Sequence, residues 1–172
     1  MFARTSNEAR SAAYGGAVAG AVAGLALTTM MTLMSLAKGN DVWYGMKGAA
    51  APFLGEVAMQ PGFDLVAVSL GLLAHLGVSM AWAVGFGLLF YHASRAMTLL
   101  GGIAWAFVVW IGIFYAVLPL VGLGAMTTEA PVGRVIAYHV FFGLGVAAVF
   151  LGYERRERLL YPPGVRKALA AR

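Results

Sequence analysis

Cysteine is absent from this 172-residue chain, and charged side chains are scarce. The lack of cysteine excludes disulfides, thiolate metal sites, cysteine nucleophiles and c-type haem attachment. Charged residues make up 11% of the chain, whereas a soluble domain usually carries about 25%. Hydrophobic residues make up 61%. Such a chain has too little polar surface to face water on all sides, so it needs lipid as its solvent.

Charged residues are missing altogether from four long apolar stretches, which cover residues 12–37, 65–90, 97–118 and 135–152. A helix needs roughly 20 apolar residues to cross the hydrocarbon core of a bilayer. The chain is therefore predicted to be all-α, a polytopic four-helix membrane bundle that forms one transmembrane domain over residues 1–172. Pro119, Gly122 and Gly124 indicate that the third helix ends near residue 118.

Basic residues are distributed unevenly between the two predicted sides of the membrane. Nine fall on the side that holds both termini, and three fall on the other: Arg4, Arg10, Arg95, Arg155, Arg156, Arg158, Arg166, Lys167 and Arg172 against Lys38, Lys47 and Arg134. Because short cytoplasmic loops are enriched in Lys and Arg, both termini are predicted to lie in the cytoplasm. The basic tail, residues 154–172, is then expected to lie against anionic headgroups, which accounts for the positive charge without a nucleic-acid partner.

The longest connection, residues 38–64, is predicted to be a loop on the outer side. Trp43 and Tyr44 are typical of a membrane interface. The segment APFLGEVAMQ, residues 51–60, is expected to form a short interfacial helix on the outer leaflet. A functional lid is the alternative for this connection, since long loops are often functional. The connection between the second and third stretches is short, so those two helices are expected to be antiparallel neighbours.

Small residues at helical spacing predict where the helices approach closely. Gly16, Gly20 and Gly24 repeat at every fourth position of the first stretch and form a groove along one face. In lipid, small residues of this kind let two backbones come together. The partner of this face is another helix of the chain or, in a homodimer, a second copy.

Histidine occurs within two of the apolar stretches. His75 lies four residues before Ser79, and His139 lies four residues before Gly143, so each pair shares one helix face. Each stretch also ends on a tyrosine and an arginine: Tyr91 and Arg95, then Tyr153 and Arg155. This similarity predicts a weak parallel repeat of two hairpins. His92 is expected to be interfacial and solvated.

Three roles are open for His75 and His139. Each neutral imidazole can hydrogen bond across a helix interface and fix the packing. The two can instead relay protons together with Glu129, although no Asp or Glu lies inside any apolar stretch. The third role is axial ligation of a b-type haem, which accepts two histidines. No other metal site is predicted.

Three segments carry a resemblance to a known family: GLLAHLGVSMAWAVGFGLLF (Gly71–Phe90), PLVGLG (Pro119–Gly124) and YHVFFGLGVAAVFLGYERRE (Tyr138–Glu157). Their order and spacing of His, Ser, Pro and Gly resemble small four-span proteins of the YagU-like acid-resistance family. The resemblance implies a bacterial inner membrane, a helical bundle and a link to acid tolerance. It brings no catalytic residues, because the family has no settled chemistry.

Sequence motifs of enzymes are missing from the chain. It has no nucleophile–base pair, phosphate-binding loop, metal-ligand cluster or dinucleotide fingerprint. We therefore expect a non-enzymatic, multi-pass inner-membrane protein of structural or accessory type. Its expected partners are the lipid bilayer and a second copy or another membrane protein. The alternative is a proton-conducting or b-haem redox module that uses His75 and His139.

Overall fold

The computed structural model describes residues 6–124 and 131–160, and these residues form helices joined by short turns. The helices are α1 (Ser6–Ala37), α2 (Tyr44–Leu54), the 3₁₀ helix η1 (Gly55–Met59), α3 (Leu65–Phe90), α4 (Arg95–Gly112), the π-helical η2 (Ile113–Val117), α5 (Leu118–Leu120) and α7 (Val132–Leu160). No strand occurs within these two ranges. The all-helical prediction is confirmed for this part of the chain.

Four of the helical segments are long and apolar enough to cross a membrane: α1, α3, the continuous run Arg95–Leu120, and α7. Their outer surfaces carry large apolar side chains in contact with the surroundings. Leu73 is 70% exposed, Leu89 64% and Leu100 67%. Soluble monomers rarely expose apolar surface on this scale. The four helices therefore indicate a multi-pass membrane protein.

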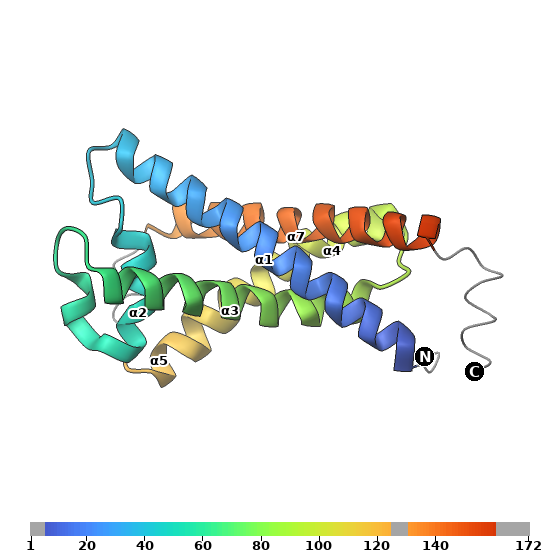
Figure 1. The fold of residues 1–172 in the computed structure, drawn as a ribbon, viewed down its shortest axis with the longest axis horizontal. Helices are drawn as coiled ribbons and strands as arrows, with labels where there is room; N and C mark the ends of the chain where they lie inside the picture. The colour runs from blue at the N-terminus through green and yellow to red at the C-terminus, as the bar shows by residue number, and fades with distance from the viewer. Residues whose placement is uncertain (1–5, 125–130, 161–172) are drawn as a thin grey trace.

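The long helices form a bundle in which α1 packs against both α3 and α7 (Figure 1). Helix α4 packs against α7, and α2 covers α3 near the end where α3 begins. The beginning of α1 and the end of α7 lie at the opposite end of the bundle, to the right in Figure 1. The two ends of the bundle therefore differ: α2 covers one, and the first turns of α1 and the last turns of α7 form the other.

Glycines of α1 allow its close approach to α3. A Cβ atom on Gly20 would lie 2.5 Å from the carbonyl oxygen of Ser79, and one on Gly16 would lie 2.8 Å from the Cα of Val84. Gly24 faces the Ser79 side chain, where a Cβ would lie 2.9 Å from Oγ. Helix α3 of the same chain therefore covers this glycine face, and the face is not free for a second copy.

A second close approach joins α4 to α7. A Cβ atom on Gly102 would lie 2.6 Å from the carbonyl oxygen of Gly143, and Gly143 in turn faces the Gly102 backbone. The two glycines are thus in direct backbone contact. The tightest pairs are α1 with α3 and α4 with α7, but the predicted internal repeat of two hairpins stays a prediction.

Helices α3 and α4 are adjacent in the chain but meet mainly through large side chains. The rings of Trp82 and Trp105 lie 6.1 Å apart, and Trp105 Nε1 donates a hydrogen bond to the Trp82 carbonyl at 3.2 Å. Phe90 fills the space in front of Gly101. These bulky groups hold the two backbones further apart than glycine-mediated contacts do.

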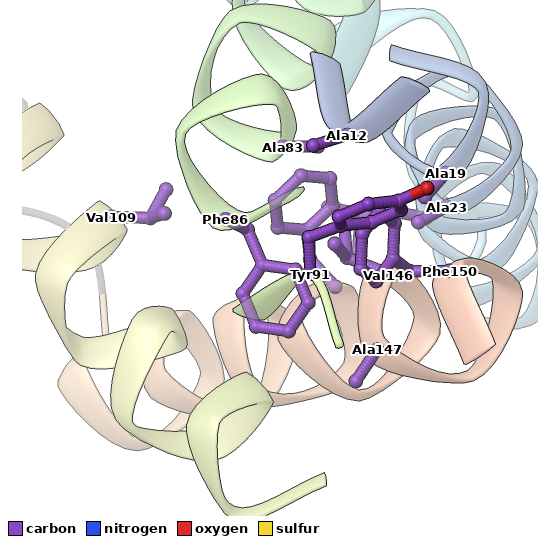
Figure 2. Close-up of a cluster of buried hydrophobic side chains, with 12 residues drawn as sticks. Ala12, Ala19, Ala23, Ala83, Phe86, Tyr91, Val109, Val146, Ala147 and Phe150 are labelled. Atoms are coloured by element: carbon purple, nitrogen blue, oxygen red, sulfur yellow. The ribbon is translucent and has the colours of Figure 1, made fainter. Parts of the chain in front are cut away.

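Aromatic rings and alanines fill the centre of the bundle (Figure 2). Phe86 of α3 and Phe150 of α7 are both fully buried, and their rings meet edge to face at a centroid distance of 5.9 Å. Tyr91 packs on Phe150 from the turn that follows α3. Ala12 and Ala83 belong to the same buried cluster, where small side chains leave room for the large rings.

Two predicted boundaries differ from the structure. The interfacial helix expected over residues 51–60 begins earlier, as α2, and ends where Gly55 adopts a φ of +66°. It packs on α3 because Gly71 leaves space for the Met46 carbonyl. The tail expected from residue 154 is helical as far as Leu160, because Glu154 turns into the bundle and is paired there. Residues 161–172 lie outside the described part.

Candidate functional site

His75 lies on α3 and faces α1. Its Nε2 hydrogen bonds with the Gly24 carbonyl at 3.3 Å, so this nitrogen carries the proton and donates it. The imidazole also borders a cavity of about 10 Å³ between α1, α2 and α3, lined by Thr28, Met31, Thr32, Gly45 and Met46. A cavity of this size holds at most one water molecule.

His139 lies on α7 in a different environment. Its Nδ1 donates to the Val135 carbonyl of its own helix at 2.8 Å. The ring of Phe114, in the π-helical segment η2, meets the imidazole at a centroid distance of 5.8 Å. His139 therefore contacts η2 and its own helix, whereas His75 contacts α1.

The structure does not join the two histidines in one site. A b-type haem needs an open ligating nitrogen on each histidine and a large cavity between them. The cavity beside His75 measures about 10 Å³ and is not lined by His139, so these residues do not fit a haem. The third member of the predicted proton series, Glu129, lies outside the described residues.

Polar side chains from α1, from α7 and from the turn after α3 meet at the end of the bundle opposite α2. We call this group the end cluster and define it as Glu8, Ser11, Tyr91, His92, Glu154, Glu157 and Arg158. Glu154 is its most buried member, 2% exposed. One carboxylate oxygen, Oε1, accepts a hydrogen bond from the His92 backbone N–H at 2.7 Å. The other, Oε2, accepts from Arg158 at 3.5 Å.

His92 forms the turn between α3 and α4 and adopts a φ of +68°. Few residues other than glycine adopt this left-handed conformation, although histidine and asparagine do so more readily than most. The hydrogen bond from its backbone to Glu154 holds the turn in place. Its ring lies between two carboxylates, with Nε2 3.8 Å from Glu8 and Nδ1 3.8 Å from Glu154.

Glu157 ties three segments together within the end cluster. It accepts hydrogen bonds from Ser11 of α1 and from the Tyr91 hydroxyl, the latter at 2.7 Å. Burial raises the pKa of Tyr91 above its ordinary value, and the negative charge of Glu157 raises it further. The neutral phenol is thus the form that this site favours.

The sequence interpretation missed the end cluster because it placed His92 in solvent and Glu154 in a tail. The ring of His92 is indeed 43% exposed, yet its backbone and both ring nitrogens face carboxylates. One signal was available in the sequence. Glu154 and Glu157 continue the helical spacing of the buried residues Gly143, Val146 and Phe150, so both carboxylates lie on the inward face of α7.

A second polar group holds the segment at the other end of the bundle, residues 38–64, which we call the α2 cap. Lys47 has no exposed surface. Its ammonium group donates to Asp41 Oδ2 at 2.7 Å, to the Gln60 carbonyl at 2.5 Å and to the Gly62 carbonyl at 2.8 Å. The hydrogen bond from Lys47, followed by that from the Trp43 backbone, lowers the pKa of Asp41. The α2 cap is therefore fixed around one buried cation.

Within residues 6–124 and 131–160, no group of three or more His, Asp and Glu is arranged to bind a metal ion. No protein-family model matches the chain, and neither does any curated protein or solved structure. The resemblance to the YagU-like family thus stays a prediction.

Proposed function

We propose that this chain is a non-enzymatic, structural or accessory protein of a bacterial inner membrane, with both termini in the cytoplasm and a role in acid stress. The distribution of charge supports this orientation. Among the described residues, five arginines lie at the end of the bundle where α1 begins, and three basic residues lie at the other: Arg10, Arg95, Arg155, Arg156 and Arg158 against Lys38, Lys47 and Arg134. Basic residues favour the cytoplasmic side.

The observation that carries the structural role is the local pairing of buried polar groups. Both intramembrane histidines are hydrogen bonded to a nearby backbone carbonyl. In the part of the chain that the structure describes, no buried side-chain nitrogen or oxygen lacks a hydrogen-bond partner. The bond from His75 crosses from α3 to α1 and fixes the packing of these two helices, as such bonds do in other membrane bundles.

Proton flux into liposomes tests this role against the conducting alternative. We expect liposomes with wild-type protein to acidify at the rate of empty liposomes across a pH step. His75→Ala and His139→Ala are expected to leave that rate unchanged, since neither imidazole belongs to a path. Flux above that of empty liposomes, abolished by either substitution, would replace the structural role with conduction.

The position of His92 supports the structural role at the end of the bundle. The charged groups around His92 are Glu8 from α1, together with Glu154 and, beyond it, Arg158 from α7. Tyr91 and Glu157 complete the surroundings. The turn between α3 and α4 is thereby joined to α1 and α7, and the link to acid stress is supported by the sequence resemblance alone.

Thermal unfolding in lipid nanodiscs tests this contact. The variant His92→Asn keeps a residue that tolerates the left-handed turn but removes the ring between the two carboxylates. Exposed polar contacts of this kind contribute up to about 1 kcal/mol, which corresponds to about 2–4 °C in Tm for a chain of this size. We expect His92→Asn to lower the Tm by up to that amount. An unchanged Tm would show that the ring does not stabilise the end cluster, and the structural role would then stand on the histidine pairing alone.

A further inference from the structure

A groove runs between α4 and α7 at the arginine-rich end of the bundle and has a volume of about 590 Å³. Binding sites for small molecules fall in the range of about 300–1,000 Å³. Three arginines line its outer part: Arg95, Arg155 and Arg158. Apolar residues one helical turn further into the membrane line its inner part, among them Leu99, Leu151 and Gly152.

Two of the three arginines have an uncompensated charge. Arg158 forms a salt bridge with Glu154, with 3.5 Å between Nη2 and Oε2. Arg95 and Arg155 are exposed and form no salt bridge within the described residues. Arg95 is also the first residue of α4, so the positive end of that helix dipole adds to the same field. The outer part of the groove therefore attracts an anion.

We propose that this groove binds an anionic phospholipid, with the headgroup phosphate on Arg95 and Arg155 and an acyl chain along Leu99, Leu151 and Gly152. Guanidinium groups bind phosphate oxygens through paired, charge-assisted hydrogen bonds. Basic pockets between transmembrane helices bind lipid headgroups in this way. The order of the two parts also matches a lipid, because the arginines lie at the helix ends and the apolar residues lie deeper.

Charge argues against a second copy of the chain as the occupant. In a two-fold symmetric dimer the same surface meets itself, so the arginines of one copy would face those of the other. Free phosphate would use the arginines but leave the apolar part of the groove empty. A phospholipid uses both parts.

Lipid binding to the purified full chain, followed by native mass spectrometry, tests the role of the arginines. The probes are phosphatidylglycerol, which is anionic, and phosphatidylcholine, which is zwitterionic. We expect phosphatidylglycerol to bind more tightly. Each arginine near a membrane surface contributes about fivefold in affinity for anionic lipid, so the double variant Arg95→Gln/Arg155→Gln is expected to bind about 25-fold more weakly. Arg156→Gln is the matched control, since Arg156 is exposed on the same helix but does not line the groove.

Gly152→Leu tests the apolar part while keeping every arginine. A Cβ on Gly152 meets no atom within 4 Å, so the larger side chain fills the groove without disturbing the helices. Gly77→Leu is its control, because Gly77 also has open space and lies on α3. We expect Gly152→Leu to weaken the binding of phosphatidylglycerol at least tenfold and to leave the binding of inorganic phosphate unchanged. Gly77→Leu is expected to change neither.

Four results would overturn the proposal. Equal binding of the two lipids, or equal loss in Arg156→Gln, would show that the arginines of the groove have no special role. Phosphatidylglycerol binding that survives Gly152→Leu would show that only a phosphate is held. A dimer that dissociates in the double variant would show that the groove is an interface between copies. Thermal unfolding of each variant confirms that it is folded before its binding is compared.

Discussion

The buried cation of the α2 cap offers the sharpest test of how this protein is held together. The perturbation is Asp41→Asn, which removes the only carboxylate that contacts Lys47 in the described structure and changes the side chain very little in size. Lys47 keeps its two carbonyl acceptors, from Gln60 and Gly62. Its charge, however, has no surface exposure and loses its counter-ion.

The burial of the two partners sets the size of the effect. Removing one partner of a buried ion pair costs about 3–5 kcal/mol, because the remaining charge is left uncompensated. The Asp41 side chain is 23% exposed, so water screens part of this interaction, and we expect about 2–3 kcal/mol. The loss acts on the α2 cap rather than on the whole bundle, since these contacts join residues within 38–64.

Trypsin measures this opening directly, because the enzyme cleaves after lysine and arginine and Lys47 is itself the buried residue. Cleavage requires the cap to open, so its rate follows the fraction of open molecules. An opening equilibrium shifted by 2–3 kcal/mol corresponds to about 30- to 160-fold faster cleavage at Lys47 in Asp41→Asn. Lys38 is exposed, and cleavage there is the internal control that should stay constant.

The same contact predicts a dependence on acid. The pKa of Asp41 is lowered from 3.8 in the folded chain, so its stabilising effect is complete above that value and is lost as pH falls through the lower folded value. Hydrogen exchange of peptides from residues 38–64 should therefore rise in strong acid in the wild type, after correction for intrinsic rates. Asp41→Asn should lack this rise. Unchanged cleavage at Lys47 in Asp41→Asn would mean that the ion pair does not hold the cap.

Two further predictions concern the helix contacts. Gly20→Leu should lower the Tm in nanodiscs by several degrees, because a Cβ at this position would lie 2.5 Å from the α3 backbone. Overpacking of this kind costs about 1–3 kcal/mol. An unchanged Tm relative to Gly77→Leu would contradict the α1–α3 packing. Tyr91→Phe should remove a loss of stability at high pH. The pKa of Tyr91 is raised in the folded chain, so the wild type is stabilised below pH 10.0, the ordinary value, and loses that stability as the phenol ionises. Equal alkaline unfolding of the two proteins, followed by circular dichroism, would exclude the hydrogen bond from Tyr91 to Glu157 as a source of stability.

Composition and periodicity by themselves determined the helices of this protein. Four uncharged apolar stretches give four long helices, because a backbone in lipid must satisfy its hydrogen bonds within each segment. The glycines of α1 likewise marked a face of close approach. Such properties depend on neighbours a few positions away in the chain, and a sequence contains that information directly.

Which surfaces and charges meet depends on the three-dimensional fold. The glycine face of α1 meets α3, whereas the sequence left open a second copy as its partner. His75 and His139 each hydrogen bond to a different carbonyl, so their similar spacing does not make one site. Ser11 reaches Glu157 across 146 positions of the chain. Whether a charged residue faces solvent or a partner therefore depends on residues far away in the chain. A charge is buried favourably only where its partner is already in place.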